Sequence, residues 1–164
     1  MNISLIGFSG TGKTAVSKLI ARRLDKKLIS TDDEISKRAR LSMEKLVKKY
    51  GWQGLREAES SIIEDLSDLD ECVFDTGSGV VLRNENIINL KKNGLVVLLT
   101  ADINVTANRL KRQEKFGNMP DAGSVLRECE EKHKKAADYA IDTSNLSPEE
   151  ACDLIIHYVQ MELQ

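Results

Sequence analysis

One glycine-rich segment near the start of the chain constrains the fold more than any other feature. Residues 7–14 read GFSGTGKT and fit the pattern Gly-x4-Gly-Lys-[Ser/Thr]. A short apolar run from Ile3 to Ile6 precedes this segment, and a stretch of helical period follows it. A strand that ends in such a loop and continues into a helix is the phosphate-binding loop, or P-loop, arrangement. The segment therefore predicts an α/β fold that binds a phosphorylated ligand.

The residue types of this loop suit phosphate chemistry. Its glycines let backbone N–H groups turn toward phosphate oxygens, and the following helix presents its positive end to the same charge. Lys13 is expected to reach the β- and γ-phosphates of ATP, and the Thr14 hydroxyl is expected to bind Mg²⁺. A glycine-rich turn without a ligand is the alternative, and the complete motif argues against it. Nucleotide binding is assigned to Gly7, Ser9, Gly10, Thr11, Gly12, Lys13 and Thr14.

Short apolar runs alternate with longer segments of helical period along the rest of the chain. This alternation is typical of a parallel sheet covered by helices on both faces, and its 164 residues suit one domain. The final helix is well specified, because Ser147, Pro148 and Glu150 form a capping box with proline at the first helical position. Five strands are expected near Ile3 to Gly7, Lys27 to Ser30, Cys72 to Thr76, Leu95 to Thr100 and Tyr139 to Thr143.

Two segments interrupt the alternation. Residues 31–70 are helical and charged, and they are longer than one crossover requires, so we expect a substrate-binding helical insertion there. Residues 112–123 contain Gly117, Pro120 and Gly123 and break the helical period, which favours a short lid over the site.

Charge and cysteine content narrow the class of partner. The formal net charge of -2 gives no electrostatic signal for nucleic acid or an anionic membrane, so a small-molecule substrate is expected. Three cysteines without Cys-x-x-Cys spacing favour a reducing cytoplasm over a disulfide framework or a structural zinc site. The sequence shows neither a signal peptide nor a membrane span, and we expect a monomer.

Three further segments carry a resemblance to a known family. They read STDDEI at residues 30–35, GWQGLREAE at 51–59 and TGSG at 76–79. With the P-loop, they resemble motifs of the shikimate kinase family, small members of the nucleoside-monophosphate-kinase-like P-loop group. The resemblance implies that fold, and it implies an ATP-dependent kinase of aromatic amino acid biosynthesis that phosphorylates a hydroxyl on a small metabolite.

The resemblance assigns roles on the acceptor side. It implies that Asp32 contacts substrate hydroxyls and accepts the proton of the attacking one, while Ser30 replaces the acid that the family places near the metal. An N-cap of a helix starting near Asp33 is the alternative role for Asp32. Arg56 would bind the substrate carboxylate and pair with Glu59, although an exposed helix pair at i, i+3 spacing is the alternative. Gly77, Ser78 and Gly79 would complete the acceptor site.

Asp75 departs from the family pattern, in which a small or apolar residue is usual. It ends the apolar run Val73-Phe74 and resembles a Walker B acid beside a P-loop. Such a carboxylate binds Mg²⁺ directly or through water, so Asp75 is expected to supply the charge that Ser30 lacks.

The resemblance weakens toward the C-terminus. Met119-Pro120 stands nearest the family's lid Arg-Pro, and Cys129 stands nearest its second carboxylate-binding arginine. Arg112 is assigned to the nucleotide, and Lys115, Arg127 and Lys132 are further candidates for the lost charges. The run from Lys132 to Lys135 is interpreted as a solvated helix face, and His133 and His157 receive no role.

Three functions follow from these motifs. The first is phosphorylation of shikimate, and the second is phosphorylation of another small hydroxylated acid, a sugar acid or a nucleoside monophosphate. The third is a nucleotide-binding module with little phosphotransfer, which the absent lid arginine favours. Release of ADP in the presence of hydroxylated acids distinguishes the third from the other two.

Overall fold

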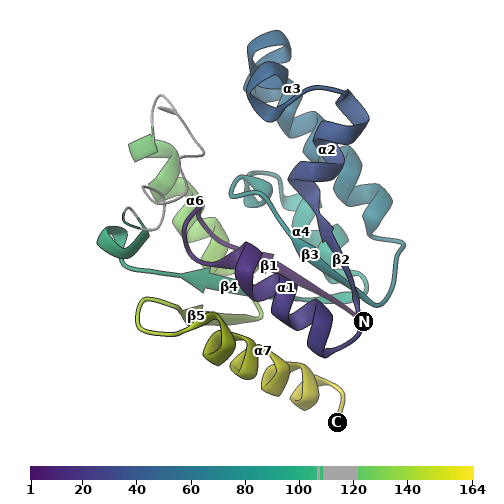
Figure 1. Ribbon diagram of the computed structural model, residues 1–164. Coiled ribbons are helices and arrows are strands. Elements are labelled where there is room, and N and C mark those ends of the chain that lie inside the picture. Colours follow the sequence, from purple (N-terminus) through teal and green to yellow (C-terminus); the bar gives the residue numbers. More distant parts are fainter. Residues whose placement is uncertain (107, 109–121) are drawn as a thin grey trace.

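The computed structural model describes residues 1–106, 108 and 122–164, and the side chains of 122–128 are not among the described parts. Its five strands form one parallel sheet in the order β2-β3-β1-β4-β5 (Figure 1). The predicted fold class and all five predicted strands are confirmed, with ends that differ by at most one residue. The strands are β1 Asn2–Ile6, β2 Lys27–Ser30, β3 Cys72–Asp75, β4 Gly94–Thr100 and β5 Tyr139–Asp142.

Helices cover both faces of this sheet (Figure 1). Successive side chains of a strand point to opposite faces, so Val97 and Leu99 pack in one hydrophobic cluster and Val96 and Leu98 in another. The first cluster lies under α1 (Lys13–Arg23) and α7 (Pro148–Glu162). The second lies under the short 3-10 helix η1 (Val80–Leu82), α4 (Asn84–Lys91) and α6 (Ala122–Ala136).

Two helices between β2 and β3 stand away from the sheet at the top of Figure 1. They are α2 (Thr31–Ala39) and α3 (Met43–Leu66), and α3 bends at Gly51, where φ is 73°. A third hydrophobic cluster joins them through Ile35, Leu46, Leu55 and Ile62. The segment 31–66 therefore carries a small core of its own, and its role as a substrate-binding insertion remains a prediction.

The helix caps confirm one sequence prediction and correct another. Ser147 and Glu150 form the expected capping box of α7. The N-cap of α2, however, is Ser30, whose hydroxyl accepts a hydrogen bond from the Asp33 backbone N–H at 3.3 Å. Asp32 lies in the first turn of the helix, so the alternative that it is the N-cap is wrong. Its carboxylate is left available for the site.

The proposed lid at 112–123 falls almost entirely outside the described residues, and Ala122 and Gly123 begin α6. In the described part of the chain, no helix combines the length and apolar character needed to cross a membrane.

Candidate active site

The P-loop lies between β1 and α1, at the carboxyl end of the sheet. Gly7, Gly10 and Gly12 have positive φ angles, and a side chain at position 7 would collide with the Leu99 carbonyl oxygen at 2.3 Å. The Lys13 ammonium turns back over this loop, and its Nζ donates hydrogen bonds to the carbonyl oxygens of Gly7 at 2.7 Å and Phe8 at 2.9 Å. The cation is thus held at the mouth of the loop, where phosphate binds in proteins of this kind.

Lys13 is a buried cation between two carboxylates. Burial lowers the pKa of Lys13 to about 8, while the charges of Asp75 and Asp32 act in the opposite direction. The ammonium therefore remains mostly protonated at neutral pH and can neutralise charge on a transferred phosphoryl group.

Asp75 and Thr14 meet beside the P-loop. The Thr14 hydroxyl donates a hydrogen bond to Asp75 Oδ2 at 2.7 Å. Burial raises the pKa of Asp75, opposed by the Thr14 hydrogen bond and by the charge of Lys13. P-loop proteins bind Mg²⁺ through the oxygen atoms of a hydroxyl and a carboxylate. Thr14 and Asp75 supply one of each, so they fit the ion.

This pair would hold Mg²⁺ only together with other ligands. Among the residues that the structure describes, no three His, Cys, Asp or Glu side chains gather to form a metal site. Magnesium usually keeps several waters and binds through one or two protein groups and substrate phosphates. The ion is therefore expected to depend on ATP for its binding.

The register of the sheet sets Ser30 and Asp75 opposite each other on β2 and β3, which yields a testable prediction about the metal. Asp75→Ala is expected to raise the Mg²⁺ concentration for half-maximal activity about ten- to a hundredfold, the range found for residues that support metal ligands. Ser30→Ala should change it little, because Ser30 is occupied in capping α2. Titration of activity with Mg²⁺ measures both, and equal insensitivity of the two variants would remove the assignment.

Asp32 lies against the loop that follows β3. Its Oδ1 is 2.8 Å from the position that a Cβ on Gly77 would take. Burial raises the pKa of Asp32, and the negative charge of Asp75 acts in the same direction, while Lys13 and Arg56 oppose it. A carboxylate with a raised pKa is better suited to accept a proton than an ordinary exposed one.

Arg56 and Glu59 form a partly buried ion pair. Arg56 Nη1 donates to Glu59 Oε1 at 3.1 Å, and the Glu59 side chain is only 2% exposed. The pair is therefore not the solvent-exposed helix pair that its i, i+3 spacing offered as an alternative. The guanidinium also lies over the Trp52 ring, 5.9 Å from its centroid. Glu59 and Trp52 together orient the cation.

Glu59 makes stability depend on pH. Burial raises its pKa from 4.5 to about 7, with the charge and hydrogen bond of Arg56 acting in the opposite direction. The folded chain thus binds the Glu59 proton more tightly than the unfolded chain, so this stabilisation is complete below pH 4.5 and is lost as the pH rises through 7.

We therefore expect the free energy of unfolding of the wild type to fall by on the order of 3 kcal/mol as the pH rises from 4.5 through about 7. Glu59→Gln should remove this fall. Denaturant unfolding at several pH values measures it, with Glu57→Gln, an exposed position on the same helix, as the control. A pH dependence that is the same in wild type and Glu59→Gln would contradict the prediction.

The loop after β3 needs glycine at two positions because charged side chains pack against its backbone. A Cβ at position 77 would lie 2.8 Å from Asp32 Oδ1 and 3.1 Å from Glu59 Oε2. At position 79 it would lie 1.9 Å from Arg56 Nη1. Close approach thus explains why the outer glycines of this TGSG segment are present.

The residues that the sequence analysis compared with the family's two arginines are partly outside the described residues and partly buried. Arg112 and Lys115 lie outside the described residues, as does the side chain of Arg127. Cys129 is 2% exposed and packs in the cluster that contains Val80 and Val81. An arginine introduced there would enter the hydrophobic core.

Sequence reasoning missed His133. The run from Lys132 to Lys135 was expected to be a solvated face, but His133 is only 1% exposed and its ring meets the Phe8 ring of the P-loop edge-on. The available signal was helical spacing, since His133 follows the buried Cys129 by four residues.

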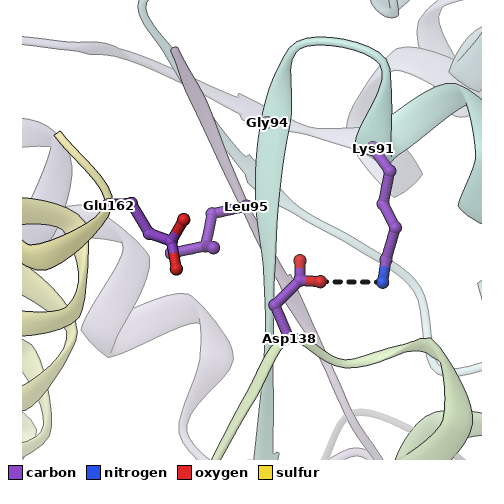
Figure 2. Close-up of a pocket in the computed structure, with 5 residues that line it drawn as sticks. All are labelled: Lys91, Gly94, Leu95, Asp138 and Glu162. Atoms are coloured by element: carbon purple, nitrogen blue, oxygen red, sulfur yellow. Dashed lines mark hydrogen bonds and ion pairs between the residues drawn. The ribbon is translucent and has the colours of Figure 1, made fainter.

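A separate pocket lies at the opposite end of the sheet, beside the first residues of β4 (Figure 2). It is lined by Lys91, Gly94, Leu95, Asp138 and Glu162, and Lys91 and Asp138 form an ion pair of 2.8 Å. Gly94 and Leu95 begin β4, whereas the P-loop follows the carboxyl end of β1. In parallel α/β sheets, ligands bind at the carboxyl ends of the strands, so we place the active site at the P-loop and not in this pocket.

Comparisons with known proteins agree with this geometry. The model of the family described as shikimate kinase matches residues 9–160. The chain is 37% identical to the shikimate kinase of Caldicellulosiruptor bescii over 160 residues, which cover 94% of this chain and 93% of the relative. It is also 37% identical to that of Geobacter sulfurreducens over 164 residues, with coverage of 97% and 91%.

Solved structures resemble the fold closely. The shikimate kinase of Acinetobacter baumannii in complex with shikimate has a TM-score of 0.88 at 24% identity and covers 98% of this chain, with 93% of its own length matched. The shikimate kinase of Aquifex aeolicus has a TM-score of 0.83 at 26% identity, with coverage of 99% and 98%.

Proposed function

The chain belongs to the shikimate kinase family, and on that premise we propose that it transfers the γ-phosphoryl group of ATP to a hydroxyl of shikimate. The observation that carries the proposal is that the charges of Lys13 and Arg56 both act on Asp32, and that Asp32 and Arg56 lie against the loop that follows β3. These side chains provide a cation for phosphate, a base for a hydroxyl and a cation for a carboxylate. Shikimate has both a hydroxyl and a carboxylate.

Each residue then has a distinct part in the reaction. Arg56 holds the acceptor carboxylate, and Asp32 accepts the proton of the attacking hydroxyl. The hydroxyl oxygen forms a bond to the γ-phosphorus while the bond from that phosphorus to the bridging oxygen of ADP breaks. Lys13 neutralises charge on the phosphoryl oxygens, and Mg²⁺, held by Thr14 and Asp75, would add positive charge to the same phosphates.

The proposal includes ATP as phosphate donor, Mg²⁺ as cofactor and a reducing cytoplasm as the setting. Supporting the last point, Cys72, Cys129 and Cys152 are all buried, and none of the three is in a disulfide. Positioning and charge neutralisation supply most of the catalysis in phosphoryl transfer, which suits a site built from fixed charges and backbone N–H groups.

The test is ADP release from ATP and Mg²⁺ against a panel of hydroxylated carboxylic acids, sugars and nucleoside monophosphates. We expect shikimate to be the best acceptor in the panel. Preference for another acceptor would overturn the substrate assignment. If no acceptor increased ADP release, the chain would be a nucleotide-binding module with little phosphotransfer.

Shikimate binding is expected to be weak, because the residue that the resemblance places nearest the family's second carboxylate-binding arginine is Cys129, which is uncharged and buried. One charge-assisted hydrogen bond contributes about 1.5 to 3 kcal/mol, so its loss should weaken binding about ten- to a hundredfold. Binding of shikimate is measured by calorimetry beside a family member with both arginines. Equal affinity would mean that another basic residue replaces the missing contact.

A further inference from the structure

Thr31 is buried at the point where β2 turns into α2, and the proposed reaction gives it no part. The ladder between β2 and β3 ends with the pair Ser30 and Asp75, and Thr31 is the next residue and the first of α2. It is 0% exposed. A buried hydroxyl is destabilising unless it is hydrogen-bonded, so the partners of this one indicate what it serves.

The Thr31 hydroxyl bonds to the backbone on both sides of Thr76. Thr31 Oγ1 accepts a hydrogen bond from the Gly77 N–H at 3.2 Å, and it donates one to the Asp75 carbonyl oxygen at 3.4 Å. Gly77 belongs to residues 76–79, the acceptor loop, whereas Asp75 ends β3. The hydroxyl therefore takes over where the backbone ladder of β2 and β3 stops, and it ties the first turn of α2 to the acceptor loop.

A second threonine fastens the same segment on its other side. The Thr76 hydroxyl donates a hydrogen bond to the Leu5 carbonyl oxygen on β1 at 2.7 Å, and the Thr76 backbone N–H bonds to the same oxygen at 3.3 Å. Strands β1 and β2 are the two neighbours of β3 in the sheet. The start of the acceptor loop is thus held from β1 by Thr76 and from the side of β2 by Thr31.

The place of Thr31 links it to two residues of the proposed reaction. It directly precedes Asp32, the proposed base, whose Oδ1 lies 2.8 Å from the position that a Cβ on Gly77 would take. Its other partner is the carbonyl group of Asp75, the proposed metal-binding residue. A shift of the acceptor loop away from α2 would therefore misplace the acceptor relative to Asp32, and a misplacement of about 1 Å can cost on the order of 10²-fold in rate.

We propose that Thr31 is a positioning residue whose hydroxyl holds the acceptor loop against the first turn of α2. It thereby fixes Gly77 and Asp75 relative to Asp32. Thr31 acts through the loop and not on the reacting atoms. Its kinetic effect rests on the proposed function, whereas its hold on the loop does not.

The first test is exchange of the Gly77 backbone amide with solvent, followed by NMR. Thr31→Val keeps the shape of the side chain and a similar helix propensity, and it removes the hydroxyl. Exchange at Gly77 is expected to become about two- to tenfold faster, as for the loss of one hydrogen bond. Thr31→Ser keeps the hydroxyl and should retain slow exchange. An unchanged exchange rate in Thr31→Val would overturn the inference.

Thr106→Val is the matched control for this substitution. It makes the same change at a threonine whose hydroxyl donates to the Ile103 carbonyl oxygen at 2.9 Å, within one helical turn. Exchange at Gly77 should stay at the wild-type rate in this variant. Equal acceleration in Thr106→Val and Thr31→Val would mean that a general loss of stability causes the effect, and the hold by Thr31 would be wrong.

The second test is kinetic. Thr31→Val is expected to lower kcat about ten- to a hundredfold and to raise KM for shikimate, while KM for ATP stays near the wild-type value because the P-loop is untouched. Thr31→Ser should recover both parameters. A variant that merely folded less well would lose kcat through a smaller active fraction and leave both KM values unchanged, and that result would overturn the positioning role.

A pair of smaller substitutions decides the question if Thr31→Val does not fold. Thr31→Ser and Thr31→Ala differ by one oxygen atom. Slow exchange at Gly77 and the higher kcat in the serine variant alone would support the hold, whereas equal behaviour of the two variants would overturn it. Failure of the wild type to phosphorylate shikimate would instead overturn the proposed function and leave the exchange at Gly77 to decide on Thr31.

Discussion

Replacing Asp32 with asparagine is expected to lower kcat about 10²- to 10⁴-fold, the range for loss of a positioned general base. Asparagine keeps the size of the side chain beside Gly77 but cannot accept the hydroxyl proton. ATP affinity should change little, because the nucleotide is held by the P-loop. Steady-state kinetics with calorimetric measurement of ATP binding would separate the two effects.

The neighbouring acid supplies a matched control for this experiment. Asp33 is exposed on the same turn of α2, so Asp33→Asn removes one nearby negative charge without touching the site. It should leave kcat within a few-fold of wild type. If both variants lost activity to the same extent, the effect would come from local charge, and the role of Asp32 as a base would be wrong.

Replacing Gly79 with alanine is expected to raise KM for shikimate about ten- to a hundredfold, as for loss of one charge-assisted hydrogen bond. The added Cβ would lie 2.2 Å from Arg56 Cζ, so the guanidinium must move away from the acceptor loop. Binding of ATP should persist, because the P-loop is untouched. Kinetics with shikimate varied at saturating ATP measures the effect.

A double variant isolates the cause of that effect. If Gly79→Ala acts by displacing Arg56, it should cost little in a chain that already carries Arg56→Ala, because the displaced side chain is absent. Additive losses in the double variant would show that position 79 affects the site independently of Arg56. The assignment of Gly79 as the support for this arginine would then fail.

The P-loop and the sheet were predictable because their signals are local. Glycine at fixed spacing, a preceding apolar run and a following helical period all lie within a few residues, and the strand from Gly94 to Thr100 reads as a continuous apolar run. The cap of α7 was predictable for the same reason, since Ser147 and Glu150 are three residues apart. Short-range chemistry of this kind is visible in the order of residues.

The N-cap role of Ser30 was not predicted from the sequence. Comparison with the family motif showed that a serine stands where the family has an acid. The structure shows that Ser30 is also the N-cap of α2. That role depends on where the helix begins, and sequence patterns locate helix ends poorly. The correction also leaves Asp32 free to face Gly77.

The sequence by itself determined the fold class, the phosphate loop and the identities of the charged residues in the candidate site. Only the tertiary structure decided which of them are buried, and burial is what gives Glu59 and Lys13 their altered pKa values. It also brought His133 from a lysine-rich stretch to the ring of Phe8, more than a hundred residues earlier in the chain. Burial and contact depend on elements distant in sequence, and dehydration of a charge or an imidazole is a property of that packed environment and not of the residue.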